Sequence, residues 1–241
     1  MNAKNFIKRA KALANVMTQT KNVEVTISGS SAYRTPGAIN VPNGDFSDSD
    51  WVAMVHGWID HELGHEAHTS HEVFITAAQE SSVMKNMLNC IEDIRMEKAV
   101  GEHFVGAKNN LSRLAELAIE RKLFVDPTVL INPSPLMILS AFCLYHGRYQ
   151  VIEQSCLSDY ADKAYSLLVE LLGDDIAAKI KALVNSIEQA NDTTDAYDIA
   201  RAILSTLEDE LNDDSDSSDS DGDSNDDSES SDSDGDSNDD S

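Results

Sequence analysis

The last 29 residues of this chain cannot contribute to a folded core. Residues 213–241 contain 14 acidic side chains, no basic residue and no apolar residue, and the sequence SDSDGDSNDDS occurs twice within them. Because such a segment has no apolar surface to bury, we expect it to be a disordered, low-complexity acidic tail. Every apolar residue of the chain therefore falls within residues 1–212, which must form the folded body.

Calcium binding is the alternative for this tail. If Gly222 is the central glycine of an EF-hand loop, the first and twelfth positions of that loop are Ser217 and Ser228. Strong calcium loops carry acidic ligands at those two positions. We therefore favour the disordered tail.

The charge of the body excludes several classes of function. Residues 1–212 hold 29 acidic and 18 basic residues, a net charge of −11. An acidic body argues against nucleic-acid binding, which needs Lys and Arg to displace the counterions of the phosphates. No apolar run approaches the ~20 residues of a membrane span, so we expect no membrane contact. Three widely spaced cysteines match no metal-binding pattern and indicate reduced thiols in a cytoplasmic protein.

The spacing of apolar residues predicts a mainly α-helical α+β fold with a small sheet. Before residue 105, five segments have a clear pattern: helices at 5–18, 51–68 and 83–100, and strands at 23–28 and 38–41. Residues 71–82 fit a helix or a loop. Between residues 105 and 211 we expect about five helices, with breaks at three prolines and near Gly147 and Gly173.

The predicted helix 51–68 carries the strongest functional signal. It contains His61-Glu62-Leu63-Gly64-His65, an HExxH motif. Residues four apart share one face of a helix, so both imidazoles can reach a single Zn²⁺ ion, as in the zincin metallopeptidases. Glu62 is then placed to accept a proton from a metal-bound water, and Gly64 to leave room above the metal. The motif also continues the apolar stripe of the helix, where ionisable groups without partners would cost several kcal/mol.

A third zinc ligand must come from another element, and the predicted helix 83–100 offers three acidic residues. We choose Glu92, which lies beside the apolar stripe and next to Arg95, a charge that needs an acid beside it. Asp93 projects nearly opposite to that stripe, and Asp93 or Glu97 would fit better if the helix docks rotated. Either of these two can instead hydrogen-bond a ligand histidine from behind and so orient it.

Three segments resemble motifs of the CobT family, whose members are cobaltochelatase subunits. Residues 57–65, GWIDHELGH, followed by Thr69, look like the family's GyxDHExxH…T segment. Residues 88–97, LNCIEDIRME, resemble its LNxxEDxRxE, and residues 104–111, FVGAKNNL, resemble the GAxxNL segment that follows. The order agrees, and an acidic low-complexity stretch comes after the helical region in both.

The motif and the resemblance together suggest how the chain is divided. We expect a zincin-like metallopeptidase core at residues 1–125, a helical extension packed on it at residues 126–212, and the acidic tail at residues 213–241. CobT-like proteins carry a von Willebrand A domain after the acidic linker, with a surface for a ring-shaped AAA+ ATPase. No segment here resembles that domain. We expect it on a separate polypeptide, or absent as in small stand-alone relatives of phage type, which would act in the host cytoplasm.

Two functions are compatible with these residues. The first is a zinc metallopeptidase in which Zn²⁺ activates a water against a peptide bond and Glu62 acts as general base. The second is a non-catalytic, zinc-stabilised subunit of a cobaltochelatase-like assembly, with an AAA+ ATPase or a von Willebrand A protein as partner and the acidic tail docked on a basic surface. A structural zinc site has no use for a base inside HExxH, which favours the enzyme. Four side chains are candidates for stabilising an oxyanion: Tyr33, His103, Tyr145 and His146.

Overall fold

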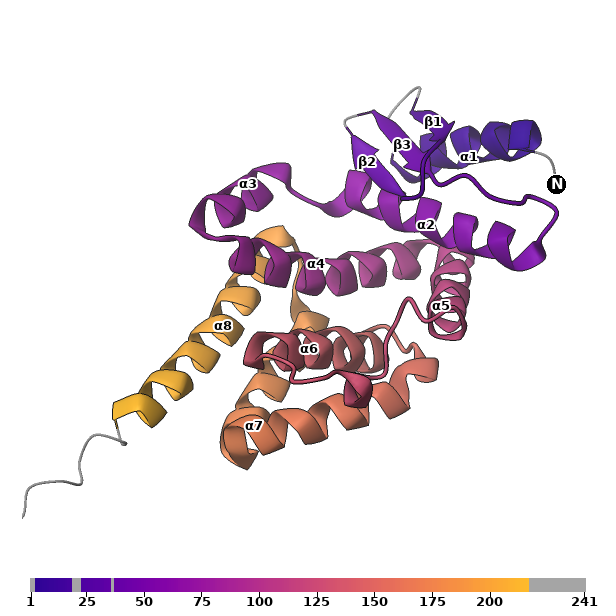
Figure 1. Cartoon of the computed structure of the whole chain (residues 1–241). Helices are drawn as coiled ribbons and strands as arrows, with labels where there is room; N and C mark the ends of the chain where they lie inside the picture. Colours follow the sequence, from indigo (N-terminus) through magenta and orange to yellow (C-terminus); the bar gives the residue numbers. More distant parts are fainter. Residues whose placement is uncertain (1–2, 19–22, 36, 217–241) are drawn as a thin grey trace, which may run out of the picture.

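The computed structural model describes residues 3–18, 23–35 and 37–216, with side chains described as far as residue 211. Figure 1 shows the elements in chain order. The helices are α1 (Ala3–Met17), α2 (Ser49–His68), α3 (His71–Glu80), α4 (Ser82–His103), α5 (Val105–Glu120), α6 (Pro135–Val151), α7 (Ser158–Asn185) and α8 (Thr193–Asp216). The strands are β1 (Glu24–Ile27), β2 (Tyr33–Thr35) and β3 (Ala38–Val41). Short 3-10 turns at Pro127–Val129, Ser155–Leu157 and Ser186–Gln189 connect the later helices.

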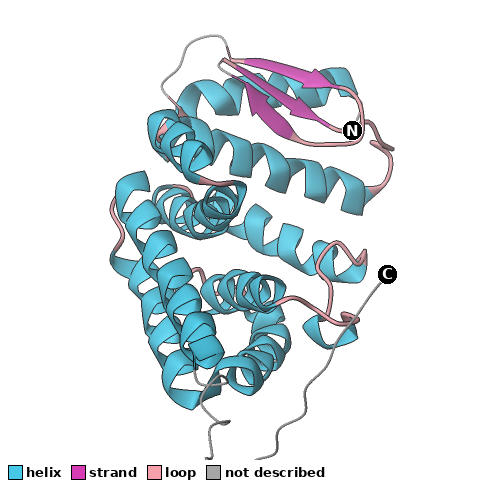
Figure 2. Ribbon diagram, turned by 60° about the vertical axis from the view of Figure 1, so that its left-hand side comes forward, coloured by secondary structure: helices cyan, strands magenta, loops and turns pink. Residues whose placement is uncertain are grey.

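The strands form one small sheet at one end of the molecule, with β3 in the middle (Figure 1). β1 runs parallel to β3, and β2 runs antiparallel to it along the other edge. The predicted strands at 23–28 and 38–41 are confirmed as β1 and β3. β2 is not predicted, because three residues are too few to show the alternation of a strand. The helices α1 and α2 cover one face of the sheet (Figure 2), against which Val25 and Ile39 are buried.

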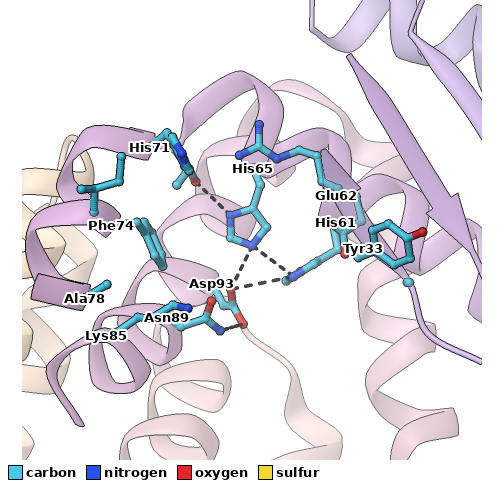
Figure 3. A pocket seen from close by; sticks show the side chains of 14 residues that line it. Tyr33, His61, Glu62, His65, His71, Phe74, Ala78, Lys85, Asn89 and Asp93 are labelled. Atoms are coloured by element: carbon cyan, nitrogen blue, oxygen red, sulfur yellow. Dashed lines mark hydrogen bonds and ion pairs between the residues drawn. The ribbon is translucent and has the colours of Figure 1, made fainter. Parts of the chain in front are cut away.

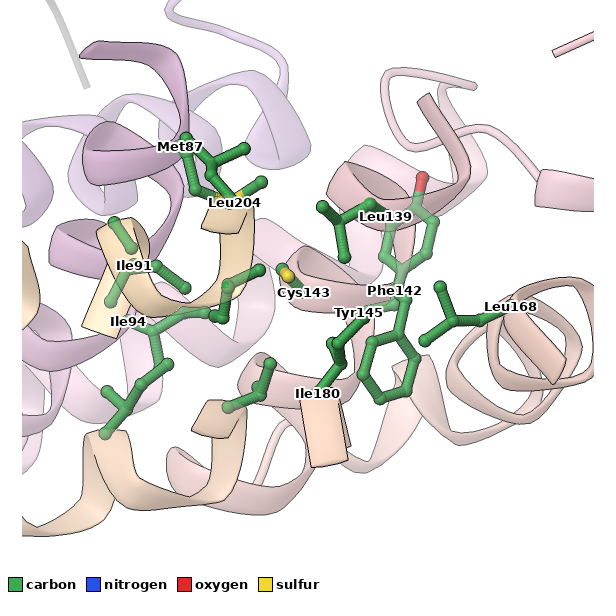
Figure 4. Packing of buried hydrophobic residues seen from close by; sticks show 14 of the residues in the cluster. Met87, Ile91, Ile94, Leu139, Phe142, Cys143, Tyr145, Leu168, Ile180 and Leu204 are labelled. Atoms are coloured by element: carbon green, nitrogen blue, oxygen red, sulfur yellow. The ribbon is translucent and has the colours of Figure 1, made fainter. Parts of the chain in front are cut away.

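The buried apolar residues form two clusters, and α4 contributes to both. One cluster lies between the sheet, α1 and α2 and includes Met96 and Val100 of α4. The other joins α3 and residues 84–94 of α4 to α6, α7 and α8 (Figure 4) and includes Ile91 and Ile94. Because its residues pack in opposite directions, α4 is the element that connects the two halves of the molecule.

The predicted helix breaks at Gly173 and near Gly147 have different outcomes. The break at Gly173 is confirmed, since this residue interrupts α7 with a φ of 76° and a ψ of 167°. The break near Gly147 is wrong, because α6 continues to Val151. A Cβ at position 147 would lie 2.5 Å from Cδ1 of Ile94. Gly147 therefore allows α6 to pack closely on α4 and does not end the helix.

The mainly helical α+β class is confirmed, and residues 71–82, which fitted either state, form α3 for most of their length. The zincin-like nature of the core and the division at residues 125 and 212 stay predictions. α8 continues to Asp216, into the start of the segment predicted as a disordered tail, and residues 217–241 lie outside the described residues. Among the described helices, none has the length and apolarity needed to cross a bilayer.

Candidate metal centre

His61 and His65 lie one turn apart on α2 and point toward α4 (Figure 3). Their Nε2 atoms are 3.2 Å apart, and their ring planes are nearly perpendicular at 85°. Both side chains are mostly buried, with exposed fractions of 20% for His61 and 13% for His65. The spacing of the HExxH motif thus brings both imidazoles to one point between the two helices.

The third group at this point is Asp93 of α4. Its Oδ1 lies 3.0 Å from Nε2 of His65 and 3.8 Å from Nε2 of His61. Within the described part of the chain, these three side chains form a group of potential metal ligands whose atoms lie within 4.8 Å of one another. Oδ1 of Asp93 is buried and makes no hydrogen bond of acceptable geometry. Its closeness to the two histidines is therefore an electrostatic contact, which a cation between the three atoms would satisfy.

The separations of these atoms fit a zinc ion. Bonds of ~2.0–2.1 Å at tetrahedral angles place neighbouring ligand atoms about 3.3 Å apart. The observed separations run from 3.0 to 3.8 Å. Two imidazoles and one carboxylate are also the donor set of hydrolytic zinc sites, in which the fourth position stays open to solvent or substrate. The residues present therefore suit Zn²⁺.

The structure places Asp93, and not the predicted Glu92, beside the two histidines. Glu92 is completely buried elsewhere. Its carboxylate accepts hydrogen bonds from the hydroxyls of Thr69 and Thr193 at 2.7 and 3.0 Å, and from Arg95 at 2.6 and 2.7 Å. The physical reason is the orientation of α4, whose apolar stripe packs against α6 to α8 and not against α2. As a result, Asp93, which was expected to project to solvent, faces the two histidines of the HExxH motif.

Glu97 lies behind His61, one of the two positions considered for it. Its Oε1 is 2.9 Å from Nδ1 of His61, and its oxygens accept hydrogen bonds from Arg148 at 2.8 and 3.0 Å. Burial would raise the pKa of Glu97, but the Arg148 charge and the His61 hydrogen bond outweigh it and lower the pKa to about 2. Burial would lower the pKa of His61, but the charges of Asp93 and Glu97 raise it to about 9. The carboxylates therefore favour a positive charge at this point.

Glu62 lines an open pocket in front of the two histidines (Figure 3). The pocket has a volume of about 500 Å³ and is bounded by residues of β2, α2, α3 and α4. Burial raises the pKa of the Glu62 carboxyl. A carboxylate whose pKa lies closer to neutrality is a better general base at neutral pH. At the rim, Arg34 of β2 pairs with Glu66 at 2.5 Å and leaves Glu62 facing the pocket.

Gly64 has a different role from the one predicted. A Cβ at this position would lie 2.1 Å from Sδ of Met96 and 2.8 Å from Cγ2 of Val100. Gly64 therefore does not open space above the metal position. It lets α2 approach α4 closely, which is what brings His65 within reach of Asp93.

Of the four oxyanion candidates, Tyr33 is the one that lines the pocket. It belongs to the edge strand β2 and is 51% exposed. The other three make hydrogen bonds away from the pocket: Tyr145 to the backbone of Val125, His146 to Asn185, and His103 to the carbonyl of Ala99. Of the four, Tyr33 therefore remains the candidate for stabilising an oxyanion.

A comparison with models of protein families matches residues 2–241 to the family described as cobalamin biosynthesis protein CobT. The chain belongs to the CobT family. This confirms the resemblance read from the three sequence segments. A search of curated proteins finds no match, and a search of solved structures finds none either.

The three CobT-like segments meet around the candidate metal centre. The first supplies the histidines of α2, and the second supplies Asp93, Glu92 and Glu97 of α4. The third supplies Asn110 of α5, whose side chain donates a hydrogen bond of 2.8 Å to the buried Asp60, next to the first histidine. Burial raises the pKa of Asp60 to about 6, although this hydrogen bond opposes the shift. Residues shared with the CobT motifs thus account for most of the site and its supports.

Sequence reasoning missed two residues of the site's surroundings, Arg148 and Thr193. Arg148 had a local signal, since it is the single charged residue in the apolar helix Pro135–Val151. A lone charge in such a helix indicates a buried partner. Thr193 begins α8 and is 1% exposed. It had no local signal, because its partner Glu92 lies 101 residues away in the sequence.

Proposed function

We propose that this protein is a metal-binding subunit of a cobaltochelatase-type assembly, in which it acts through protein partners. The observation that carries the proposal is the convergence of His61, His65 and Asp93 on one point in a chain of the CobT family. In this function the three side chains hold Zn²⁺. We place this role in the cytoplasm, where reduced cysteines are the rule.

Charge explains why a cation would stabilise the folded protein here. Asp93 brings a carboxylate to the junction of α2 and α4, and its buried oxygen lacks a hydrogen-bond donor of good geometry. An ion bound to both helices would satisfy this oxygen and both Nε2 atoms at once. Because the unfolded chain has no preformed site, metal binding adds directly to the free energy of unfolding.

The acidic tail supports a role that depends on partners. Residues 213–241 contain 14 acidic residues and no base. A segment of that charge attracts basic surfaces over a range set by the ionic strength. We assign it to docking on a basic surface of an AAA+ ATPase or of a protein with a von Willebrand A domain.

Zinc-dependent peptide hydrolysis is the second candidate, and the position of Glu62 favours it. Glu62 lines the pocket beside both histidines. Zinc would supply an activated water there, and the Glu62 carboxylate is the group of this chain able to accept its proton. The strand β2 borders the same pocket, and among the described residues it pairs with β3 on one side alone, so an extended peptide could add to its other edge. A purely structural zinc site explains neither the position of Glu62 in the pocket nor the strand edge beside it.

The first experiment measures metal content by mass spectrometry on purified protein. We expect about one zinc per chain for wild type and for Glu62→Gln, and none for the double variant His61→Ala, His65→Ala. Asp93→Asn should lose most of the metal, whereas Glu72→Gln, an exposed carboxylate on α3, is the matched control and should keep it. Full metal retention in the double histidine variant would refute the site.

The second experiment separates the two functions. Wild type and Glu62→Gln are incubated with a peptide library and, separately, with an immobilised AAA+ subunit of a cobaltochelatase. The subunit function predicts no cleavage by either protein and equal capture of both, with capture that weakens as salt is added. Cleavage by wild type that Glu62→Gln lacks would establish the hydrolase instead.

A further inference from the structure

Two buried chains of hydrogen bonds lead from the histidines to the C-terminal helices. In the first, Nδ1 of His61 lies 2.9 Å from Oε1 of Glu97. Both oxygens of Glu97 are held by the guanidinium of Arg148, which comes from α6. Glu97 is 4% exposed and Arg148 is 7% exposed, so water cannot replace these contacts.

The second chain starts at His65. Its Nδ1 lies 3.0 Å from Oγ1 of Thr69, which donates its hydroxyl hydrogen to Oε1 of Glu92 at 2.7 Å. The same oxygen of Glu92 accepts a hydrogen bond from Thr193, the first residue of α8, at 3.0 Å. Arg95 donates to both oxygens of Glu92 and also to the carbonyl of His68. This second chain thus also ends on a buried arginine and on a helix distant in sequence.

These chains determine which nitrogen of each ring carries the proton. Thr69 has one hydroxyl hydrogen and gives it to Glu92, so its oxygen must accept a hydrogen from Nδ1 of His65. The carboxylate of Glu97 likewise accepts a hydrogen from Nδ1 of His61. A neutral imidazole protonated at Nδ1 presents the lone pair of Nε2. Both lone pairs then point toward Oδ1 of Asp93, as a shared metal ion requires.

We propose that Arg148 and Thr193 are positioning residues for the metal centre: they hold Glu97 and Glu92 so that His61 and His65 present Nε2 to the metal. Neither residue lines the pocket, so each acts through its carboxylate. The helices α6 and α8 therefore support the chemistry of a site built on α2 and α4. The inference rests on the metal binding proposed above, and its test is designed to separate the two.

The first readout is Co²⁺ binding to the full chain, measured by titration and by the visible absorption of the bound ion. The variants are Arg148→Met, Arg148→Lys, which keeps the charge but not the paired contact, and Thr193→Val, which keeps the shape but not the hydroxyl. Loss of a partner behind a ligand histidine typically weakens metal affinity about 10- to 100-fold. We expect a loss of this size for Arg148→Met, a smaller loss for the other two variants, and an altered absorption spectrum.

A matched control separates positioning from general stability. Leu168→Ala truncates a completely buried apolar side chain of α7 that takes part in neither chain of hydrogen bonds. It should lower the melting temperature and leave the Co²⁺ affinity and spectrum unchanged. Wild-type affinity and spectrum in folded Arg148→Met and Thr193→Val would overturn the proposal. If Arg148→Met does not fold, the same measurement on Arg148→Lys and Thr193→Val decides: wild-type Co²⁺ affinity and spectrum in both would overturn the proposal.

The second readout needs no metal. Long-range ¹H–¹⁵N spectra of the metal-free protein, recorded at about pH 10, well above the ordinary pKa of an imidazole, report which ring nitrogen carries the hydrogen. Wild type should show Nδ1–H for His61 and His65, and Thr193→Val should reduce that form for His65 alone. Unchanged spectra in Thr193→Val and Arg148→Lys would refute the positioning role. A wild-type protein that shows these tautomers but binds no Co²⁺ would refute the metal function and, with it, the role toward a metal, and would leave only the control of the histidine tautomers by Glu97 and Glu92.

Discussion

The pH dependence of zinc binding tests the candidate centre most directly. In the metal-free protein the charges of Asp93 and Glu97 overcome burial and raise the pKa of His61 to about 9. A proton on His61 must leave before Nε2 can bind zinc. Affinity should therefore rise with pH, by about tenfold per pH unit, until pH reaches the pKa of His61. A histidine with an ordinary pKa near 6.5 would give a flat profile above about pH 7.

The size of the effect follows from the two pKa values. The difference between about 9 and the ordinary 6.5 corresponds to roughly 3 kcal/mol of preference for the protonated ring, at about 1.4 kcal/mol per pKa unit. At pH 7 this proton should weaken the apparent zinc affinity about 100-fold relative to its limit at high pH. Lowering the pH further should weaken binding further, because the proton and the metal compete for the same lone pair.

The assay is competition for zinc against a chromophoric chelator at half-unit steps between about pH 6 and 10, corrected for the chelator's own protonation. Glu97→Gln removes one of the three charges that raise the pKa of His61, those of Asp93, Glu97 and Glu62. Its profile should therefore level off at a lower pH than that of wild type. An affinity that is flat from pH 7 to 9 in wild type would refute the electrostatic reasoning, whether or not zinc binds.

The remaining predictions concern stability and the tail. Asp60→Asn should make the metal-free protein more stable at neutral pH, by up to roughly 3 kcal/mol. Burial raises the pKa of Asp60 in the folded protein to about 6. Wild type therefore loses stability as the pH rises from the pKa of Asp60 in the unfolded chain through 6. Urea unfolding at pH 3.5 and 7.5 checks this, and a pH-independent difference would contradict it. Gly64→Ala should destabilise by about 1–3 kcal/mol through overpacking, since its Cβ would meet Met96; unfolding with an unchanged midpoint would argue against the close helix contact. Deleting residues 217–241 should leave the melting temperature and zinc content unchanged because the segment has no apolar residue, and a lower melting temperature would show that it contributes to the fold.

Local patterns predicted the elements of this fold well where the pattern was long. The helices that became α2 and α4 follow from apolar residues at helical spacing, and β1 and β3 from β-branched or apolar runs. The HExxH spacing alone predicts that both histidines and Glu62 lie at one site, without any knowledge of tertiary contacts. Such inferences succeed because the geometry of one helix turn is fixed by the backbone.

The acidic residue that lies beside the two histidines was not predictable in the same way, because it depends on how α4 is rotated about its axis. The sequence shows one apolar stripe, and Glu92 borders it. That stripe faces α6 to α8, while a second, shorter face with Met96 and Val100 meets α2. When a helix is buried on two sides, its apolar pattern does not show which face meets which neighbouring helix. Asp93 lies on the second face, and only the packing of the whole chain reveals it.

This two-sided burial of α4 has a consequence for the mutations that the protein tolerates. From Ile91 to Glu97, six of seven consecutive side chains are buried, and the seventh, Asp93, faces the metal position. An ordinary surface helix resists substitution at every third or fourth position, where it meets the core, and accepts it at the solvent-facing positions between them. A saturation scan of α1, which has one buried face, should show that rhythm. Across residues 91–97 the scan should show no such rhythm, so this stretch should drift more slowly in evolution than a helix with one buried face.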